Sequence, residues 1–290
     1  MADDPTASGT PAPVSNFAAK LSNFGGAQAV KANAAQLSAN TVRIDPGGAT
    51  FPTIGQAIAS ITDASQQKEY LLTIGPGTYN EQVTLKPFVY LDGAGPGQTI
   101  INYPPTQDAF SRGTVIAASN SGIGDMTVTC EGGSWGDWST AVVIGGCTPF
   151  YADNVQMVCD DQGNAGINIE TCAVNWNSEG QGPSQVYISY SSVTANAQSG
   201  QSSGLALITS GLNAACNVEC IESKFVATGG TNPIGAYSNY NSNITLDNCY
   251  IEGAYFALDL SDAAITANNC QINGPVQNGV VINNYTPPAE

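Results

Sequence analysis

Acidic side chains and tryptophans gather in one stretch of this chain of 290 residues, between positions 131 and 179. Its acids are Glu131, Asp137, Asp153, Asp160, Asp161, Glu170 and Glu179. All three tryptophans lie in turn-rich segments of the same stretch, at Trp135, Trp138 and Trp176. An exposed indole stacks on the apolar face of a pyranose ring while carboxylates bind its hydroxyls. The pattern therefore predicts sugar contact by Trp135, Asp137, Trp138 and Trp176. The alternative is that these indoles only pack on the flank of the fold.

Two neighbouring aspartates in the same stretch are candidates for acid/base catalysis and for cation binding. Asp160 and Asp161 could act as an acid/base pair, and with Asp153 they could ligate a hard cation such as Ca²⁺ through carboxylate oxygens. Adjacent acids are also common as solvated turn residues, and Asp259 and Asp262 are interpreted as such. Asp160 and Asp161 are thus the candidate catalytic residues, with Asp153 added for a Ca²⁺ site, and no other cofactor is indicated.

The residue types that are missing or scarce exclude whole classes of site. The chain has no histidine, which removes Ser-His-Asp and Cys-His catalysis and every His-ligated metal site. Cys216 and Cys220 lack a matching second pair, so no zinc site is predicted. Seven Lys and Arg against 23 Asp and Glu give a net charge of −16, which excludes nucleic acid and anionic membrane surfaces as partners. No apolar run reaches the roughly 20 residues of a transmembrane helix, so no membrane insertion is expected.

The amino-terminal part differs in composition from the rest of the chain. Residues 1–13 are rich in Pro, Ser, Thr and Asp, and we expect a disordered leader rather than a signal peptide. Residues 14–41 are Ala-rich, and Phe17, Leu21 and Phe24 fall at helical spacing. Gly25 and Gly26 interrupt the pattern, so we expect two short amphipathic helices or one broken helix. Such a stripe must cover something apolar, either the open end of the following domain or a neighbouring subunit.

From residue 42 to the end at residue 290 the chain repeats one pattern, and a short helix is expected at residues 53–61. Six segments share a polar turn residue, a small or apolar residue, a polar residue and then a large apolar one. They are 125–128 (DMTV), 154–157 (NVQM), 190–193 (YSSV), 222–225 (ESKF), 248–251 (NCYI) and 269–272 (NCQI). A second apolar strand follows each, at 141–144, 166–169, 205–208, 234–237, 257–260 and 279–282.

Short strands repeated in phase without intervening helices predict an all-β fold, a right-handed parallel β-helix. Alternate residues then point inward and stack on the next coil, which places Val128, Met157, Val193, Phe225, Ile251 and Ile272 in one column. The turn column suits Asn, whose side chain tolerates the left-handed conformation. Cys249 and Cys270 share an inward column one coil apart, as stacked thiols or as a disulfide. The alternative fold is a β-sandwich.

Residues 43–102 resemble the opening of the pectinesterase-like branch of the pectin-lyase-type β-helix proteins. Residues 43–58 (RIDPGGATFPTIGQAI) are similar to that family's first strand and capping helix. Residues 74–81 (IGPGTYNE) and 91–101 (LDGAGPGQTII) are similar to the two blocks that follow, in the same order and spacing. These blocks build the first coils of such proteins and do not carry their chemistry.

The resemblance implies an esterase mechanism that this sequence does not support. Members use one Asp as nucleophile, a second Asp as acid/base and an Arg that holds the first. None of their three motifs is present, and the segment at the position of the first reads Cys159-Asp160-Asp161-Gln162. The only arginines are Arg43 and Arg112, both before that position. Without a cation nothing aims the nucleophile. We therefore expect no ordinary pectin methylesterase activity, and any surviving activity would be that of an atypical carbohydrate esterase.

Two classes of function remain. The first is an extracellular or cell-surface protein that binds or modifies a polysaccharide, supported by the low Lys content and the sequons at Asn243 and Asn284. The second is a structural β-helix subunit of a spike, coat or filament that self-assembles without enzymatic activity. A monomer that binds glycans favours the first class, and concentration-dependent polymers favour the second.

Overall fold

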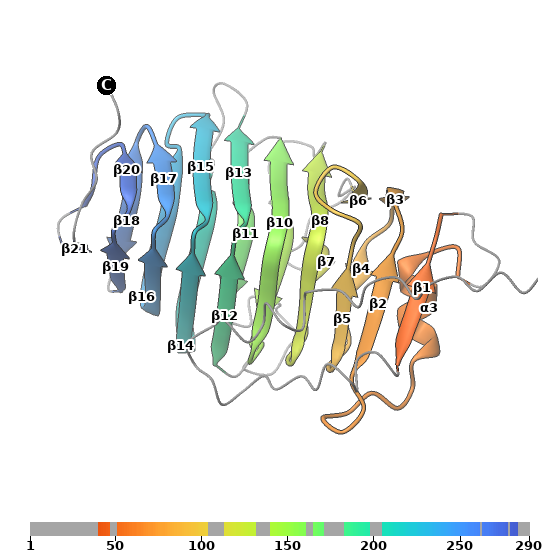
Figure 1. The fold of residues 1–290 in the computed structure, drawn as a ribbon. Coiled ribbons are helices and arrows are strands. Elements are labelled where there is room, and N and C mark those ends of the chain that lie inside the picture. Colours follow the sequence, from red (N-terminus) through yellow and green to blue (C-terminus); the bar gives the residue numbers. More distant parts are fainter. Residues whose placement is uncertain are drawn as a thin grey trace, which may run out of the picture.

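The computed structural model describes residues 40–46, 51–103, 113–131, 140–160, 165–170, 183–197, 205–261, 263–277 and 279–283. Within them the chain winds as a right-handed parallel β-helix, the hand that parallel strand connections adopt. Its strands stand side by side along one axis, from β1 (orange) to β20 (blue) (Figure 1). All pairings between the described strands are parallel, which excludes the β-sandwich. Residues 1–39, with the predicted leader and nearly all of the predicted Ala-rich helical segment, lie outside the described residues.

Each coil contributes to three parallel sheets, here called A, B and C. Sheet A contains β1 (Thr41–Ile44), β2 (Tyr70–Ile74), β5 (Val89–Asp92), the first parts of β8 (Ser121–Glu131) and β10 (Phe150–Asp160), β12 (Ser184–Ser189), the last parts of β14 (Leu205–Ile221) and β16 (Ile234–Asp247), β19 (Ala264–Asn268) and β21 (Val281–Asn283). Sheet B contains β3 (Gly77–Asn80), β6 (Thr99–Asn102), the last parts of β8 and β10, β13 (Ser192–Ala197), β15 (Lys224–Gly229), β17 (Tyr250–Gly253) and β20 (Gln271–Asn273). Sheet C contains β4 (Val83–Thr84), β7 (Gly113–Ile116), β9 (Thr140–Gly145), β11 (Ala165–Glu170), the first parts of β14 and β16, and β18 (Phe256–Ser261).

The six predicted turn residues form the bend between sheets A and B. All six have a left-handed backbone, with φ between 47° and 53°, namely Asp125, Asn154, Tyr190, Glu222, Asn248 and Asn269. Asn and Asp adopt this conformation readily, whereas Tyr190 and Glu222 are held in it by the coils on either side. The backbone N–H of Glu222 donates to Asp247 O at 2.9 Å, and that of Asn248 donates to Asn268 O at 3.0 Å. The turn column inferred from the sequence is confirmed.

The predicted core column is confirmed strand by strand. Val128 pairs in register with Met157, Met157 with Val193, Val193 with Phe225, Phe225 with Ile251 and Ile251 with Ile272. All six side chains are buried. Five of the six predicted second strands belong to sheet C. The sixth, at 279–282, overlaps β21, which pairs with β19 in sheet A instead.

Cysteines line the same interior. The seven described cysteines are buried and are not joined in disulfides, at Cys130, Cys147, Cys159, Cys216, Cys220, Cys249 and Cys270. Cys249 and Cys270 are neighbours in one inward column, and the Cys249 N–H donates to Cys270 Sγ at 3.4 Å. Cys130 and Cys159 also lie opposite each other on adjacent coils. Of the two alternatives for Cys249 and Cys270, the structure therefore has the stacked thiols and not the disulfide.

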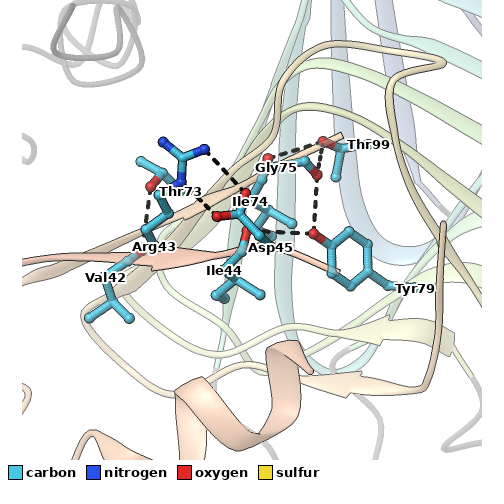
Figure 2. A network of polar contacts seen from close by, with 9 residues as sticks. All are labelled: Val42, Arg43, Ile44, Asp45, Thr73, Ile74, Gly75, Tyr79 and Thr99. Atoms are coloured by element: carbon cyan, nitrogen blue, oxygen red, sulfur yellow. Dashed lines mark hydrogen bonds and ion pairs between the residues drawn. The ribbon is translucent and has the colours of Figure 1, made fainter. Parts of the chain in front are cut away.

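The family-like blocks of the first coils hold the backbone together. Figure 2 shows Tyr79 and Thr99 converging on Gly75, whose carbonyl oxygen accepts from Tyr79 Oη and from Thr99 Oγ1, each at 3.1 Å. Arg43 is exposed and pairs with Asp45 at 2.8 Å between Nε and Oδ2. These polar groups are therefore engaged in structure, as the sequence predicts.

The predicted helix at residues 53–61 is α3 (Ile54–Ser60), which buries Ile54, Ala57 and Ile58 in the core. Thr53 Oγ1 accepts from the Gln56 N–H, and the Glu81 carboxylate accepts from the N–H groups of Ile54 and Gly55 at 2.8 and 2.9 Å. A carboxylate at this end satisfies backbone donors that the first turn leaves unpaired. Among the described residues, no helix combines the length and the apolar composition that a membrane crossing requires.

Candidate functional site

The sugar-binding and Ca²⁺ residues predicted from the acidic stretch are mostly outside the described part of the chain. Trp135, Asp137, Trp138, Asp161 and Trp176 all lie there. Asp160 is described through its backbone, as the last residue of β10 in sheet B. The predicted roles of these residues therefore stay predictions.

Asp153 is the one predicted Ca²⁺ ligand whose side chain is described. It lies in sheet A with an exposed fraction of 0%, and Ser189 Oγ donates to its Oδ1 at 2.5 Å. The bend at Asn154 separates it from Asp160 on the next sheet. In the described ranges, no three His, Cys, Asp or Glu side chains are grouped as a metal site would need. The Ca²⁺ site stays a prediction.

An open groove runs along the bend between sheets A and B and crosses four coils. Its volume is about 550 Å³. Its lining residues are Pro96, Asn154, Val155, Gln156, Tyr190, Ser191, Ser192, Glu222, Ser223, Lys224, Asn248 and Tyr250. Apart from Pro96, they all belong to the repeated segments, so the repeat itself builds the groove.

The order of residues within each repeat explains the concave shape. The first residue of each repeat, such as Tyr190 or Glu222, stands at the bend in the left-handed conformation and faces outward. The second residue is buried beneath the bend, and Ser191 and Ser223 form the floor of the groove there. The third residue begins sheet B and forms the wall, as Lys224 does.

The hydroxyl groups of the floor serines are engaged in hydrogen bonds with the backbone. Ser223 Oγ donates to Ile221 O at 2.9 Å and accepts from the Ser191 N–H at 3.1 Å. Ser191 Oγ donates to Ser189 O at 2.7 Å and accepts from the Val155 N–H at 3.1 Å. A nucleophilic serine donates its proton to an adjacent general base, whereas each of these two hydroxyls donates to a backbone carbonyl oxygen. The floor is therefore suited to shaping a ligand site and not to attacking a ligand.

The wall carries one cation and an aromatic ring. Lys224 Nζ lies 5.0 Å from the centroid of the Tyr250 ring, within the range of a cation–π contact. Tyr250 Oη donates to Glu252 Oε2 at 2.5 Å, and this hydrogen bond raises the pKa of Tyr250. No ion pair joins Lys224 to another residue of the described ranges. The ring holds the ammonium group at the groove without neutralising it.

Tyr190 presents the other ring, and 49% of it is exposed at the bend. Gln156 stands on the wall of the neighbouring coil, where its Oε1 accepts from Thr127 Oγ1 at 3.1 Å. An exposed aromatic ring can stack on the apolar face of a pyranose, and neighbouring amide, carboxylate and ammonium groups can hydrogen-bond its hydroxyls. The side chains of the groove can therefore contact both the apolar face and the hydroxyl groups of a sugar ring.

Sheet C carries a carboxylate that sequence reasoning misinterpreted. Asp259 lies in the middle of β18 and pairs in register with Tyr237, so its interpretation as a turn residue is wrong. Burial raises the pKa of Asp259. The strand itself was predicted at residues 257–260, so only the role of a solvated turn residue given to Asp259 is corrected.

Sequence reasoning also missed the groove. It placed Tyr190, Glu222 and Asn248 at turns and gave no role to Lys224. The signal that could have found the groove is the third position of the repeats, read down the column as Thr127, Gln156, Ser192, Lys224, Tyr250 and Gln271. A column that is polar throughout but unlike from coil to coil indicates an exposed, chemically varied face.

Comparison with known proteins shows which solved structures have a similar fold. No sequence model of a protein family matches the chain, and no curated protein matches it in sequence. In structure it is similar to the pectin methylesterase of Aspergillus niger, with 14% identity, a TM-score of 0.52 and coverage of 86% of this chain and 85% of that one. It is also similar to the pectin methylesterase of carrot, with 14% identity, a TM-score of 0.51 and coverage of 86% and 88%. The chain thus has the pectinesterase-like parallel β-helix fold that residues 43–102 predict.

Proposed function

We propose that the protein binds a polysaccharide along the groove between sheets A and B, outside the cell or at its surface. The observation that carries the proposal is the groove itself, with the exposed ring of Tyr190 and the polar wall that includes Lys224. An elongated groove that crosses several coils suits a polymer better than a single small molecule. The fold gives further support, because proteins of the same fold are pectin methylesterases.

The proposal does not include the esterase reaction of those proteins. The reaction that the sequence resemblance implies needs an ionised Asp that is aimed by an Arg and a second acid for the leaving methoxide. No arginine follows Arg112 in this chain, and the described Arg43 is paired with Asp45 in the first coil. The net charge of −16 would also repel de-esterified pectin, which is a polyanion. Binding without ordinary ester hydrolysis is therefore the expected outcome.

Binding is tested on a glycan array and then by titration calorimetry with the polysaccharide that binds best. The variant Tyr190→Asn removes the ring but keeps a residue that accepts the left-handed backbone, as Asn154 and Asn248 do at the same bend. The matched control is Tyr240→Asn, because Tyr240 is also exposed and left-handed but lies outside the groove. We expect a loss of affinity of about tenfold or more for Tyr190→Asn and none for the control.

Two results would overturn the proposal. One is that no polysaccharide binds, or that both tyrosine variants bind as tightly as the parent. The other concerns catalysis and is measured as methanol released from esterified pectin. Turnover that Asp160→Asn or Asp161→Asn abolishes would show that these carboxylates work as an esterase without the arginine.

A further inference from the structure

We propose that the groove prefers a glycan that carries a single anionic group, a carboxylate or a sulfate, and that Lys224 binds this group. The inference rests on the proposed polysaccharide binding and names the class of glycan that the groove takes. It comes from the surroundings of Lys224, which is the one cation among the residues that line the groove.

A second lysine of the same molecule shows how a lysine on a tyrosine ring is neutralised. Lys68 Nζ lies 5.4 Å from the centroid of the Tyr70 ring, and Tyr70 Oη donates to Asp63 Oδ1 at 2.6 Å. Asp63 also accepts from Lys68 Nζ, so a single carboxylate binds both the phenol and the ammonium group. The ring fixes the position of the ammonium group, and the carboxylate neutralises its charge.

Lys224 has the same ring and the same acid-bound phenol but lacks the ion pair. Its Nζ lies 5.0 Å from the centroid of the Tyr250 ring, and Tyr250 Oη donates to Glu252 Oε2 at 2.5 Å. Within the described ranges, no carboxylate lies within ion-pair distance of Lys224. The ring attracts the ammonium group without neutralising it. An anionic oxygen of a ligand can therefore bind Lys224 as Asp63 binds Lys68.

The acid that is nearest to Lys224 in the sequence stands at the bend. This acid is Glu222, which has a left-handed backbone with φ 47°, whereas Lys224 is the first residue of β15 in sheet B. Both side chains are exposed and line the groove, and Ser223 is buried between them in the floor. A ligand in the groove therefore meets an ammonium group that no described carboxylate neutralises.

The rest of the lining favours one anionic group over many. Apart from Glu222 and Lys224, the side chains that line the groove carry no charge at neutral pH. Neighbouring coils are about 4.8 Å apart, so the further anionic groups of a polyanion would lie over neutral side chains or close to the Glu222 carboxylate. The net charge of −16 repels a polyanion as a whole. A glycan with one anionic group among neutral sugars gains the contact with Lys224 and avoids this repulsion.

The test ranks the glycans of an array by charge and uses Tyr190→Asn to select those that bind in the groove. Among glycans whose binding this variant weakens, we expect those with a single carboxylate or sulfate to bind best and polygalacturonate, the polyanionic probe, to bind worse. Titration calorimetry then compares the best charged glycan with its own neutral form, made by carboxyl reduction or by desulfation. The parent should bind the charged form about fivefold more tightly at low salt. This ratio should fall as salt is added, because salt screens exposed charges.

Variants of two lysines assign the preference to the groove. Lys224→Gln should make the affinities for the charged and neutral forms nearly equal, whereas Lys224→Arg, which keeps the charge and can keep the ring contact, should retain the preference. The matched control is Lys68→Gln, because it changes the net charge by the same amount and also removes a lysine from a tyrosine ring, but outside the groove. This control should keep the ratio of the parent. Thermal melting of each variant checks that it folds.

The outcomes separate this inference from the proposed function. If Lys224→Gln left the ratio unchanged, the inference would be overturned while polysaccharide binding stood, because Tyr190→Asn reports on binding independently. Tighter binding of polygalacturonate than of singly charged glycans would also overturn it, in favour of a groove for acidic polymers. If no glycan binding depended on Tyr190, the proposed function would fail, and this inference would fail with it.

Discussion

At the scale of single residues, Asp259 shows how the coil changes the chemistry of a side chain. It stands within β18 rather than in a turn, and burial raises its pKa above the ordinary value. A raised pKa in the folded state means that the folded protein binds the proton more tightly than the unfolded chain does. The stabilising effect of this proton is fully present below the unfolded pKa and is lost as pH rises through the folded pKa.

We therefore expect Asp259→Asn to raise the free energy of unfolding at pH 7 and to leave it nearly unchanged at about pH 3. Urea denaturation at both pH values measures the effect. Asp63→Asn is a control of opposite sign, because hydrogen bonds from Lys68 and Tyr70 lower the pKa of Asp63. Its contribution is present above the unfolded pKa and lost as pH falls, so this variant should destabilise the protein at pH 7 only. Equal effects at both pH values would contradict the assignment for Asp259.

At the scale of elements, the inward columns hold the coils together, and Phe225 is the largest member of its column. It is 0% exposed and lies between Val193 of β13 and Ile251 of β17. Phe225→Ala should cost about 3–5 kcal/mol of unfolding free energy, because it removes buried area and leaves a cavity that the fixed coil spacing cannot close. Phe225→Leu, which keeps most of the volume, should cost roughly 1 kcal/mol. A cost for the alanine variant below that of the leucine variant would show that the column is not tightly packed.

The same columns explain what the sequence could and could not predict. In each of the six repeats the bend residue has a left-handed backbone and the fourth residue is apolar and buried. The repeat pattern is therefore enough to place Asn154, Asn248 and Phe225. The third positions of the repeats indicate an exposed polar face, but they do not give the concave shape of the groove, because that shape depends on which side chains meet across coils. Ser191 and Ser223 look like any turn serines until the register brings them together as a floor. The polysaccharide contacts predicted at the tryptophans rest on composition alone, because these residues do not belong to the repeated segments.

At the scale of the whole molecule, the two ends of the β-helix differ in stability. The first coil is closed by α3, whose N-terminal N–H groups are held by Glu81. The last coil leaves Val281 and Ile282 exposed. In a stack where each coil contacts only its neighbours, an end that buries less apolar surface opens first. Unfolding in isolation should therefore begin at the carboxyl-terminal end.

Buried thiols distributed along the axis can report this order. Burial raises the pKa of the Cys147 thiol to about 11, and it also keeps the Cys220 thiol protonated at ordinary pH, so neither reacts while its coil is closed. With urea increased stepwise at about pH 8, iodoacetamide should label Cys249 and Cys270 before Cys130 and Cys159, as read from peptide masses. Labelling in the fully unfolded, unreduced protein is the control, since any thiol tied up in a disulfide would stay unlabelled there. If all four thiols became reactive at the same urea concentration, the β-helix would unfold as one cooperative unit, and the open end at β21 would be no weaker than the end capped by α3.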